Sequence, residues 1–381
     1  MSKVQHNSGR KICILRSNPV RPDSRVEKEA WSLKKAGYDV HILAWDRDTD
    51  EEEANDYIRV AGLEIPITRL GYKATYGEGF KNIKPYLKFQ FHMRKWLQKN
   101  NFDVVHACDF DTAFFTQGVV RKKKELFVFD IFDFLFGEPS GFMQRCVKKA
   151  QFQIINRANA TIICTEERKA QIRGSHPRKL AVVHNTPATV QIGKCGKRTE
   201  ITERVKLVYV GILQDYRLLL EIAQAVSESE VLELHVGGFG KYEDYFTRMA
   251  QEYNNIKFYG RLTYEETLSL EEECDIMLAI YDPSIENHRF AAPNKFYESL
   301  MIGKPVMMVK NTGMAQIVED KAIGVVIDYS KESFVNGVNL LVQQRENWSC
   351  IGEKMKSIYR DHYCWDEMEK RLLDIYSQIL Q

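Results

Sequence analysis

Short apolar stretches alternate with longer amphipathic stretches twice along this chain, and this doubled alternation restricts the possible folds more than any other feature. The first series opens with an apolar run at residues 11–16, a helical stretch at residues 22–36 and a second apolar run at Asp39–Trp45. The second series restarts at Lys206–Val210 and repeats the same order. A strand, a helix and a parallel strand in succession form a right-handed crossover unit. We therefore predict an α/β protein with two Rossmann-like domains facing a cleft.

A break in the pattern separates the two series. Residues 185–204 contain Pro187, Gly193, Gly196 and a cluster of Lys and Arg, which is typical of an interdomain linker. The 381 residues also exceed the size of one ordinary hydrophobic core. We therefore place an N-terminal domain at residues 1–186, a second domain at residues 205–363 and a final helix at residues 364–381.

The composition fits a globular protein and argues against several functional classes. Hydrophobic residues make up 44% of the chain and charged residues 28%. The net charge of +2 is too small to indicate a nucleic-acid partner. The eight cysteines form no Cys-x-x-Cys pair, so the sequence predicts neither a metal site nor a redox motif, and we expect no cofactor. The start lacks the apolar core of a signal peptide, and no run reaches about 20 apolar residues, so we expect a cytoplasmic protein with free thiols.

The stretch Pro293–Val306 carries the clearest chemistry. Pro293 fits the first position of a helix, Gly303 ends that helix, and residues 305–309 follow as a buried strand. Asn294, Lys295 and Glu298 share one face of this helix. The free N–H groups at its start suit a diphosphate, and the Glu298 carboxylate can accept hydrogen bonds from both hydroxyls of a ribose. The alternative is an acidic residue that only stabilises its own helix, by about 0.3–1 kcal/mol.

The loops that follow strands of the second series are the other candidate binding segments, because ligands bind outside the carboxyl ends of parallel strands. Gly211 follows the first strand, and Arg217 is expected in the first turn of the next helix, where a guanidinium could hold a diphosphate. The further candidates are Gly238 and Gly240 after the second strand and Tyr259, Gly260 and Arg261 after the third. A tight turn explains the glycines equally well, and Arg217 and Arg261 could be ordinary exposed residues.

The segment Glu298 with Gly303-Lys304-Pro305-Val306 resembles the nucleotide-sugar-binding helix of glycosyltransferase family 4 and its relatives. The resemblance implies the GT-B fold, with a last helix that crosses back onto the first domain, and a nucleotide-sugar donor whose ribose Glu298 holds. One departure is that Phe290 stands where the family has a second glutamate, which contacts the donor sugar.

The resemblance also implies roles for the loop residues. In the family, two cations hold the diphosphate one and six residues after the glycine that matches Gly211. Arg217 matches the second position, whereas the first is Ile212, and Lys295 is the natural substitute. The glycine loop at 237–240 then lies by the nucleotide, and the backbone at 259–262 meets the base.

In the first half, Val105–Asp111 resembles the family's His-Ala-His-Asp segment, with Cys108 in place of the second histidine. The resemblance implies that His106 contacts the donor sugar. Alternatively, His106 is a satisfied polar residue and Asp109 caps a helix. If the reaction is retaining, Arg217 and Lys295 stabilise the leaving phosphate; if it is inverting, Asp109 is the first candidate for the base. The loop at 17–25 lacks the family's glycines, so it is either reshaped or used for the acceptor.

Three stretches of the first half mix basic and apolar residues: Lys84–Lys99, Arg121–Lys124 and Phe142–Lys149. Such stretches are typical of peripheral contact with an anionic membrane, although solvated helix faces look similar. The family resemblance, taken with these features, implies a hexosyl-type glycosyltransferase, retaining rather than inverting. We expect it to move a sugar from a UDP-linked donor to a hydroxyl acceptor, a glycan or a lipid-linked saccharide, in polysaccharide synthesis at the inner face of a membrane. A sugar-nucleotide 2-epimerase and an inactive sugar-nucleotide binder are the alternatives.

Overall fold

The computed structural model describes residues 9–75, 82–136, 139–187 and 204–381. The chain divides into two compact units. The first comprises Met1–His184 together with Met368–Gln381, and the second comprises Asn185–Glu367. Most of the predicted linker, the start of the chain and the glycine-containing segment near residue 79 lie outside the described residues.

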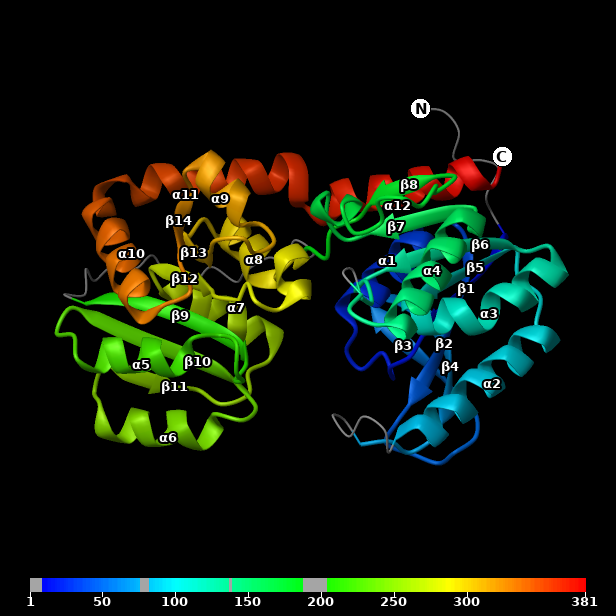
Figure 1. Ribbon diagram of the computed structural model, residues 1–381, viewed down its shortest axis with the longest axis horizontal. Helices are drawn as coiled ribbons and strands as arrows, with labels where there is room; N and C mark the ends of the chain where they lie inside the picture. Colours follow the sequence, from blue (N-terminus) through cyan, green and yellow to red (C-terminus); the bar gives the residue numbers. More distant parts are fainter. Residues whose placement is uncertain (1–8, 76–81, 137–138, 188–203) are drawn as a thin grey trace. The chain divides into compact units, whose positions relative to one another are not determined.

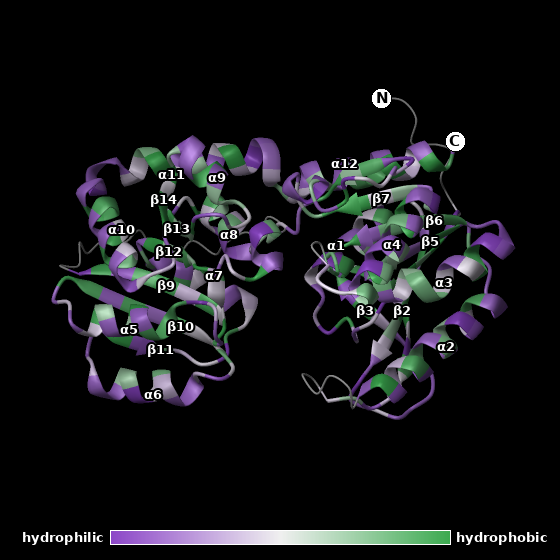
Figure 2. Ribbon diagram, viewed as in Figure 1, coloured by the Kyte–Doolittle hydropathy of each residue, from purple (hydrophilic) through white to green (hydrophobic). Residues whose placement is uncertain are grey.

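The first unit is built on an eight-stranded sheet with the order β3-β4-β2-β1-β5-β6-β7-β8 (Figure 1). Its strands are β1 (Lys11–Arg16), β2 (Asp39–Asp46), β3 (Ala54–Val60), β4 (Leu63–Gly71), β5 (Val104–Cys108), β6 (Leu126–Ile131), β7 (Ala160–Ile163) and β8 (Leu180–Val182). Its helices are α1 (Ser24–Lys35), α2 (Ile83–Lys99), α3 (Asp109–Lys123) and α4 (Phe142–Arg157), with a short 3-10 turn η2 (Glu167–Lys169). All neighbouring strands pair in parallel except β3 and β4. Apolar strands covered by amphipathic helices explain this parallel core (Figure 2).

The second unit has a six-stranded, fully parallel sheet with the order β11-β10-β9-β12-β13-β14. Its strands are β9 (Val205–Ile212), β10 (Leu232–Phe239), β11 (Ile256–Phe258), β12 (Ile276–Ala279), β13 (Val306–Val309) and β14 (Gly324–Ile327). Its helices are α5 (Leu219–Ser227), α6 (Glu243–Glu252), α7 (Tyr264–Glu273), α8 (Asn294–Ile302), α9 (Ala315–Lys321), α10 (Lys331–Gln343) and α11 (Trp348–Ile358). Three short helical turns are η3 (Glu286–Phe290), η4 (Arg345–Asn347) and η5 (Tyr359–Tyr363).

The last helix, α12 (Trp365–Ile379), returns the chain to the first unit, as the family resemblance implied. Glu369 on this helix pairs with Lys35 of α1 at 3.0 Å, and its other carboxylate oxygen accepts a hydrogen bond from Ser32 at 3.1 Å. The sulfur of Met368 accepts a hydrogen bond from the His184 backbone N–H. These contacts anchor residues 368–381 to the first unit.

Each sheet has one point where the strand order reverses, and ligands of such sheets bind in the crevice outside the carboxyl ends of the strands at that point. In the first sheet the reversal lies between β1 and β5. In the second sheet it lies between β9 and β12. These two positions determine where functional residues are sought below.

Several sequence predictions were wrong in detail. Strand β3 was not predicted; it begins at Ala54 and forms an antiparallel hairpin with β4 at the sheet edge. Helix α5 begins at Leu219, after Arg217 rather than before it, since Tyr216 and Leu218 have positive φ angles of 67° and 56°. Pro293 is the N-cap of α8 rather than its first residue. Helix α9 was not predicted, because its seven residues are too short to show a clear period.

Candidate functional site

The candidate site of the second unit lies where β9 and β12 end. Gly211, near the end of β9, leaves open the space that a side chain would fill, and the Lys295 ammonium occupies this space. The Lys295 Nζ atom would lie only 2.8 Å from a Cβ at position 211. The same ammonium lies over the ring of Tyr209, 4.7 Å from its centroid. Helix α8 therefore brings its first-turn cation to the switch point of the sheet.

The neighbours of Lys295 stabilise the charged form of its ammonium group. Burial lowers the pKa of this group, but the phenols of Tyr281 and Tyr209, followed by the carboxylates of Glu298 and Glu271, outweigh burial and raise it. Lys295 is therefore an ammonium ion at neutral pH. A charged group held at a glycine-lined strand end suits an anionic ligand.

Arg217 lies at the same switch point but does not belong to a helix. It precedes α5 in the tight segment with positive φ angles, and its guanidinium stacks on Tyr281 at 4.1 Å. Its Nη1 atom donates to the Tyr216 carbonyl at 3.0 Å and contacts His288 Nε2 at 3.1 Å. The prediction of a first-turn position was wrong. The residue nevertheless presents a second cation, held by an aromatic face.

Glu298 lies one turn further along α8 and is 5% exposed. Its carboxylate shares a hydrogen bond with the Tyr264 hydroxyl at the start of α7, and burial raises the pKa of Tyr264. The carboxylate is thus held in one orientation close to the start of α8. At this entrance, the Asn294 side chain accepts a hydrogen bond from Asn185 at 3.3 Å. This arrangement fits a carboxylate that receives the hydroxyls of a bound nucleoside.

The glycines Gly238, in the last residues of β10, and Gly240, directly after β10, are required by close backbone packing. A Cβ at Gly238 would lie 1.8 Å from the Gly211 carbonyl, and one at Gly240 would lie 2.8 Å from the Leu213 carbonyl. Both residues also have left-handed φ angles, of 133° and 135°. No other residue fits position 238, so the sequence interpretation of a simple tight turn is incomplete: the glycines bring two strand ends together.

The end of β11 completes this side of the site. The Gly260 carbonyl accepts a hydrogen bond from the Gly238 N–H at 2.6 Å. The Tyr259 hydroxyl bonds His235 Nδ1 at 2.8 Å, with the two rings stacked. The Arg261 guanidinium lies over the exposed ring of Phe239 at 4.0 Å. These stacked, exposed groups offer flat surfaces of the kind that a nucleobase contacts.

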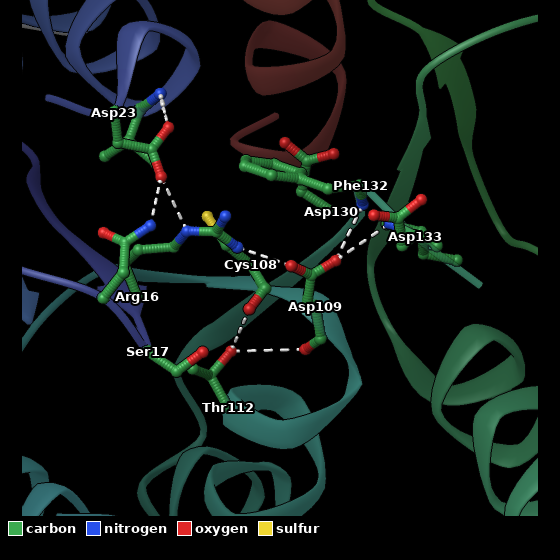
Figure 3. Close-up of polar contacts among 12 residues, drawn as sticks. Arg16, Ser17, Asp23, Cys108, Asp109, Thr112, Asp130, Phe132 and Asp133 are labelled. Carbon is green, nitrogen blue, oxygen red and sulfur yellow. Dashed lines mark hydrogen bonds and ion pairs between the residues drawn. The ribbon is translucent and has the colours of Figure 1, made fainter. Parts of the chain in front are cut away.

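The first unit has a polar cluster at its own switch point (Figure 3). Arg16, at the end of β1, donates from Nη1 to Asp109 Oδ2 at 2.5 Å and from Nε to Asp23 at 2.7 Å. The other Asp109 oxygen accepts from the backbone N–H groups of Phe132 and Asp133 after β6, at 2.9 and 3.1 Å. Asp109 thus ties together the ends of three neighbouring strands.

Asp109 is a partly exposed carboxylate with a raised pKa. Its backbone is left-handed, with φ 67°, and 24% of its side chain is exposed. Burial raises the pKa of Asp109 to about 6, against the opposing effect of Arg16. A carboxylate with this pKa is ionised at neutral pH and close enough to it to act as a general base.

His106 does not lie at an open surface. The side chain is fully buried on β5, where Nδ1 bonds the Tyr376 hydroxyl of α12 at 2.8 Å and Nε2 lies 3.3 Å from Asp130. His106 therefore lies in the interior with both ring nitrogens close to polar partners, which agrees with the alternative of a satisfied polar residue. Its ring has no exposed edge that could contact a donor sugar. The His-Ala-Cys-Asp segment brings Asp109 to the site but not His106.

Sequence reasoning missed the aromatic partners of the cations. Tyr209 and Tyr281 hold Lys295 and Arg217, and His288 contacts Arg217. Tyr209 precedes Gly211 by two residues, and Tyr281 lies two residues after the end of β12. Their positions at strand ends were the only available signal. Arg16 was missed because a basic residue ending a strand has no distinctive motif.

The known families and structures agree with this architecture. A model described as Glycosyltransferase Family 4 matches residues 25–186, and one described as Glycosyl transferases group 1 matches residues 196–357. The search of curated proteins found no match.

Three solved structures illustrate the likeness of the fold. The sucrose-phosphate synthase of Thermosynechococcus elongatus has a TM-score of 0.74 at 13% identity, covering 97% of this chain and 99% of that one. HepE of Anabaena, solved with UDP, has a TM-score of 0.68 at 14% identity, covering 97% and 100%. The α,α-trehalose 6-phosphate synthase of Burkholderia multivorans has a TM-score of 0.68 at 11% identity, covering 98% and 97%. With both halves matched by family models and both units built as Rossmann-like α/β domains, the chain belongs to the GT-B glycosyltransferases of the family 4 type.

Proposed function

We propose that this glycosyltransferase moves a sugar from a UDP-linked donor to a hydroxyl acceptor. The proposal rests on one observation above all, the meeting of Lys295 and Arg217 beside Gly211 at the switch point of the second sheet. Two cations next to a glycine strand end suit a diphosphate whose negative charge grows as the glycosidic bond breaks. UDP is favoured because HepE, a structural neighbour, was solved with UDP and with UDP-glucose.

The other residues take parts that follow from their positions. Glu298 receives the ribose hydroxyls, while Gly238, Gly240 and the segment 259–261 surround the rest of the nucleotide. The first unit binds the acceptor, and Asp109 faces it. We propose retaining chemistry, in which the leaving phosphate held by Lys295 and Arg217 accepts the acceptor's proton. Asp109 would be the base of an inverting reaction, whereas His106, being buried, has no catalytic part in this proposal.

A donor screen tests the function directly. Tag-free protein is mixed with UDP-, GDP- and ADP-sugars, and the thermal unfolding midpoint is followed for each. A UDP-sugar should raise the midpoint more than the other nucleotides, because ligands that bind only the folded state stabilise it. Lys295→Met should lose this shift, whereas Lys257→Met, an exposed residue of β11, should keep it. Equal shifts with all three nucleotides would refute the choice of UDP.

An inactive sugar-nucleotide binder is the second candidate, and two positions favour it. Ile212 is half exposed and stands at the position where the family has a cation. Phe290 ends the turn η3 and stands at the position where the family has a glutamate. Such a protein would bind the donor without turning it over. Slow release of UDP by the purified chain, absent in Lys295→Met, would exclude this candidate.

We further propose that the first unit contacts an anionic membrane, and that the protein works at its cytoplasmic face with a lipid-linked acceptor in polysaccharide synthesis. Along α2, the exposed apolar residues Ile83, Leu87 and Phe91 alternate with exposed Lys84 and Lys88. They line a hollow of about 980 Å³ with Tyr72, Glu52, His92 and Lys95. Within the described residues, no helix is both long and apolar enough to span a membrane.

The other two basic stretches lie at opposite edges of the first sheet, one at the start of α4 and one at the end of α3. Phe142 and Met143 at the start of α4 are 77% and 79% exposed. The start of α4 and the start of α2 both lie toward the carboxyl edge of the sheet, because each helix leads back to the beginning of a parallel strand. Arg121–Lys124 end α3 just before β6 and therefore lie toward the opposite edge. The proposed membrane surface comprises α2 and the start of α4, without the end of α3.

A further inference from the structure

A buried cluster of metal-binding side chains lies on one face of the first sheet. His106 and Cys108 alternate along β5 and therefore point to the same face. Asp130 of β6 pairs in register with Cys108, so its side chain lies beside that of Cys108. Ligand atoms of these three residues all lie within 4.8 Å of one another, and all three side chains are completely buried. The parallel register of β5 and β6 fixes this group.

Glu29 of α1 supplies a fourth possible ligand. It is fully buried, and within the described residues neither of its carboxylate oxygens accepts a hydrogen bond of standard geometry. Its Oε1 lies 3.0 Å from Arg25 Nε, and its Oε2 lies 3.7 Å from His106 Nε2. A buried carboxylate is costly unless it is paired, and Arg25 pairs with Oε1, so Oε2, which faces His106, is the oxygen available to a metal ion.

We propose that His106, Cys108, Asp130 and Glu29 bind one structural Zn²⁺ ion. A thiolate, an imidazole and two carboxylates are all accepted zinc ligands, and four protein ligands are typical of a closed structural site. Bonds of about 2.0–2.2 Å to nitrogen and oxygen in a tetrahedron place these atoms roughly 3.3–3.6 Å apart. The observed distance from His106 Nε2 to Asp130 Oδ2 is 3.3 Å, and that to Glu29 Oε2 is 3.7 Å. Glu29 is not among the residues whose ligand atoms all lie within 4.8 Å of one another, so its carboxylate must move closer to complete the site.

The surroundings of the cluster also fit a metal. The second ring nitrogen of His106 bonds the Tyr376 hydroxyl at 2.8 Å, as zinc-binding imidazoles bond an outer partner through the nitrogen that does not bind the metal. Arg25 holds Asp130 through Nη2 at 2.8 and 3.0 Å. Its positive charge and that of Zn²⁺ together balance the three negative ligands Cys108, Asp130 and Glu29. Binding releases the protons of the thiol and of the Glu29 carboxyl group.

The rival arrangement needs no metal. Burial raises the pKa of Glu29, so a protonated Glu29 carboxyl can share its proton with Asp130. The two arrangements differ in metal content and in the state of the Cys108 sulfur. The zinc proposal does not depend on the donor or acceptor, because the cluster lies beneath the strand end rather than at the exposed site.

The test uses the full chain without a histidine tag, purified from zinc-supplemented medium. Elemental analysis should find one zinc per chain, and cobalt exchange should give the charge-transfer absorption of a thiolate–Co²⁺ bond. Cys108→Ser should abolish both signals, whereas Cys350→Ser, which removes an exposed thiol, should keep them. Tyr376→Phe should weaken zinc binding by about 10- to 100-fold, the usual effect of losing such an outer partner.

Folding of the variants is checked by circular dichroism. Should Cys108→Ser fail to fold, X-ray absorption at the zinc edge of the unaltered protein decides the question. A shell with one sulfur and three nitrogen or oxygen atoms supports the proposal. Folded, unaltered protein that retains no zinc after gel filtration and gives no cobalt–thiolate band would overturn it, as would zinc whose amount is unchanged in Cys108→Ser.

Discussion

Arg16 and Asp109 meet across the point where the strand order of the first sheet reverses, with Nη1 2.5 Å from Oδ2. Arg16 ends β1, and Asp109 follows β5, so the ion pair joins two strands that are adjacent in space but far apart in sequence. Two backbone N–H groups after β6 hold the other carboxylate oxygen. The pair fixes the one partly exposed carboxylate that we consider as a base.

The pH dependence of the reaction should reveal whether Asp109 acts as this base. Burial raises the pKa of Asp109 to about 6. A general base works only when ionised, so in an inverting reaction kcat/KM should be full above this pH and should fall as the pH drops through about 6. Arg16→Met removes a cation that lowers the pKa of Asp109, so the acid limb should move to higher pH. The measurement is a pH–rate profile with saturating acceptor.

Two further variants make this result interpretable. Arg121→Met, an exposed residue in the last turn of α3, should leave the acid limb where it is. Asp109→Asn should abolish activity in an inverting enzyme. An Asp109→Asn protein that keeps most of its activity and the same acid limb would show that Asp109 only positions the strand ends, in agreement with retaining chemistry.

Glu298 should contribute strongly to nucleotide affinity. If its carboxylate accepts the ribose hydroxyls, Glu298→Ala should weaken UDP binding by about 1.5–3 kcal/mol, the range for hydrogen bonds to charged groups. Isothermal titration calorimetry measures the change. Glu319→Ala, at an exposed position of α9, serves as the control. Unchanged UDP affinity in a folded Glu298→Ala protein would leave only the role of an acidic residue that stabilises its own helix.

Lys295 and Arg217 should act on the transition state more than on the ground state. Each change to Ala should lower kcat more than it raises the donor KM, because charge on the leaving diphosphate increases during bond cleavage. Steady-state kinetics with the preferred UDP-sugar provide the comparison. Variants that keep kcat and lose only donor affinity would limit both residues to binding. Lys257→Ala, at an exposed position of β11, is the matched control.

Membrane binding should depend on α2 and not on the end of α3. Each basic residue near an anionic surface contributes about 1 kcal/mol, so Lys84→Glu with Lys88→Glu should reduce vesicle binding by at least about tenfold. Lys122→Glu with Lys124→Glu should have a much smaller effect, since these residues lie toward the other edge of the sheet. Co-sedimentation is compared for anionic and neutral vesicles, at low and high salt. Equal recovery in the supernatant with both lipids at low salt would remove the membrane from this account.

The fold was largely predictable because its signals are local. Alternating apolar and amphipathic stretches indicated two α/β domains with parallel strands, and both sheets have that arrangement. The hairpin of β3 and β4 was not predicted, because the exposed residues of β3 resemble an acidic loop. The position of Arg217 was misjudged because left-handed backbone at Tyr216 and Leu218 delays the start of α5, and no sequence rule signals that conformation in these residues.

The sequence by itself determined the two-domain α/β class, the strand-end position of Gly211 and the helix face that carries Lys295 and Glu298. These features depend on residue order and period, which a single sequence displays. Only the tertiary structure decided that Lys295 fills the space beside Gly211, that Arg16 meets Asp109, and that His106 is buried against Tyr376 and Asp130. Each of these contacts joins residues far apart in the chain. Their distances depend on strand register and on helix placement over the sheet, which residue spacing alone does not specify.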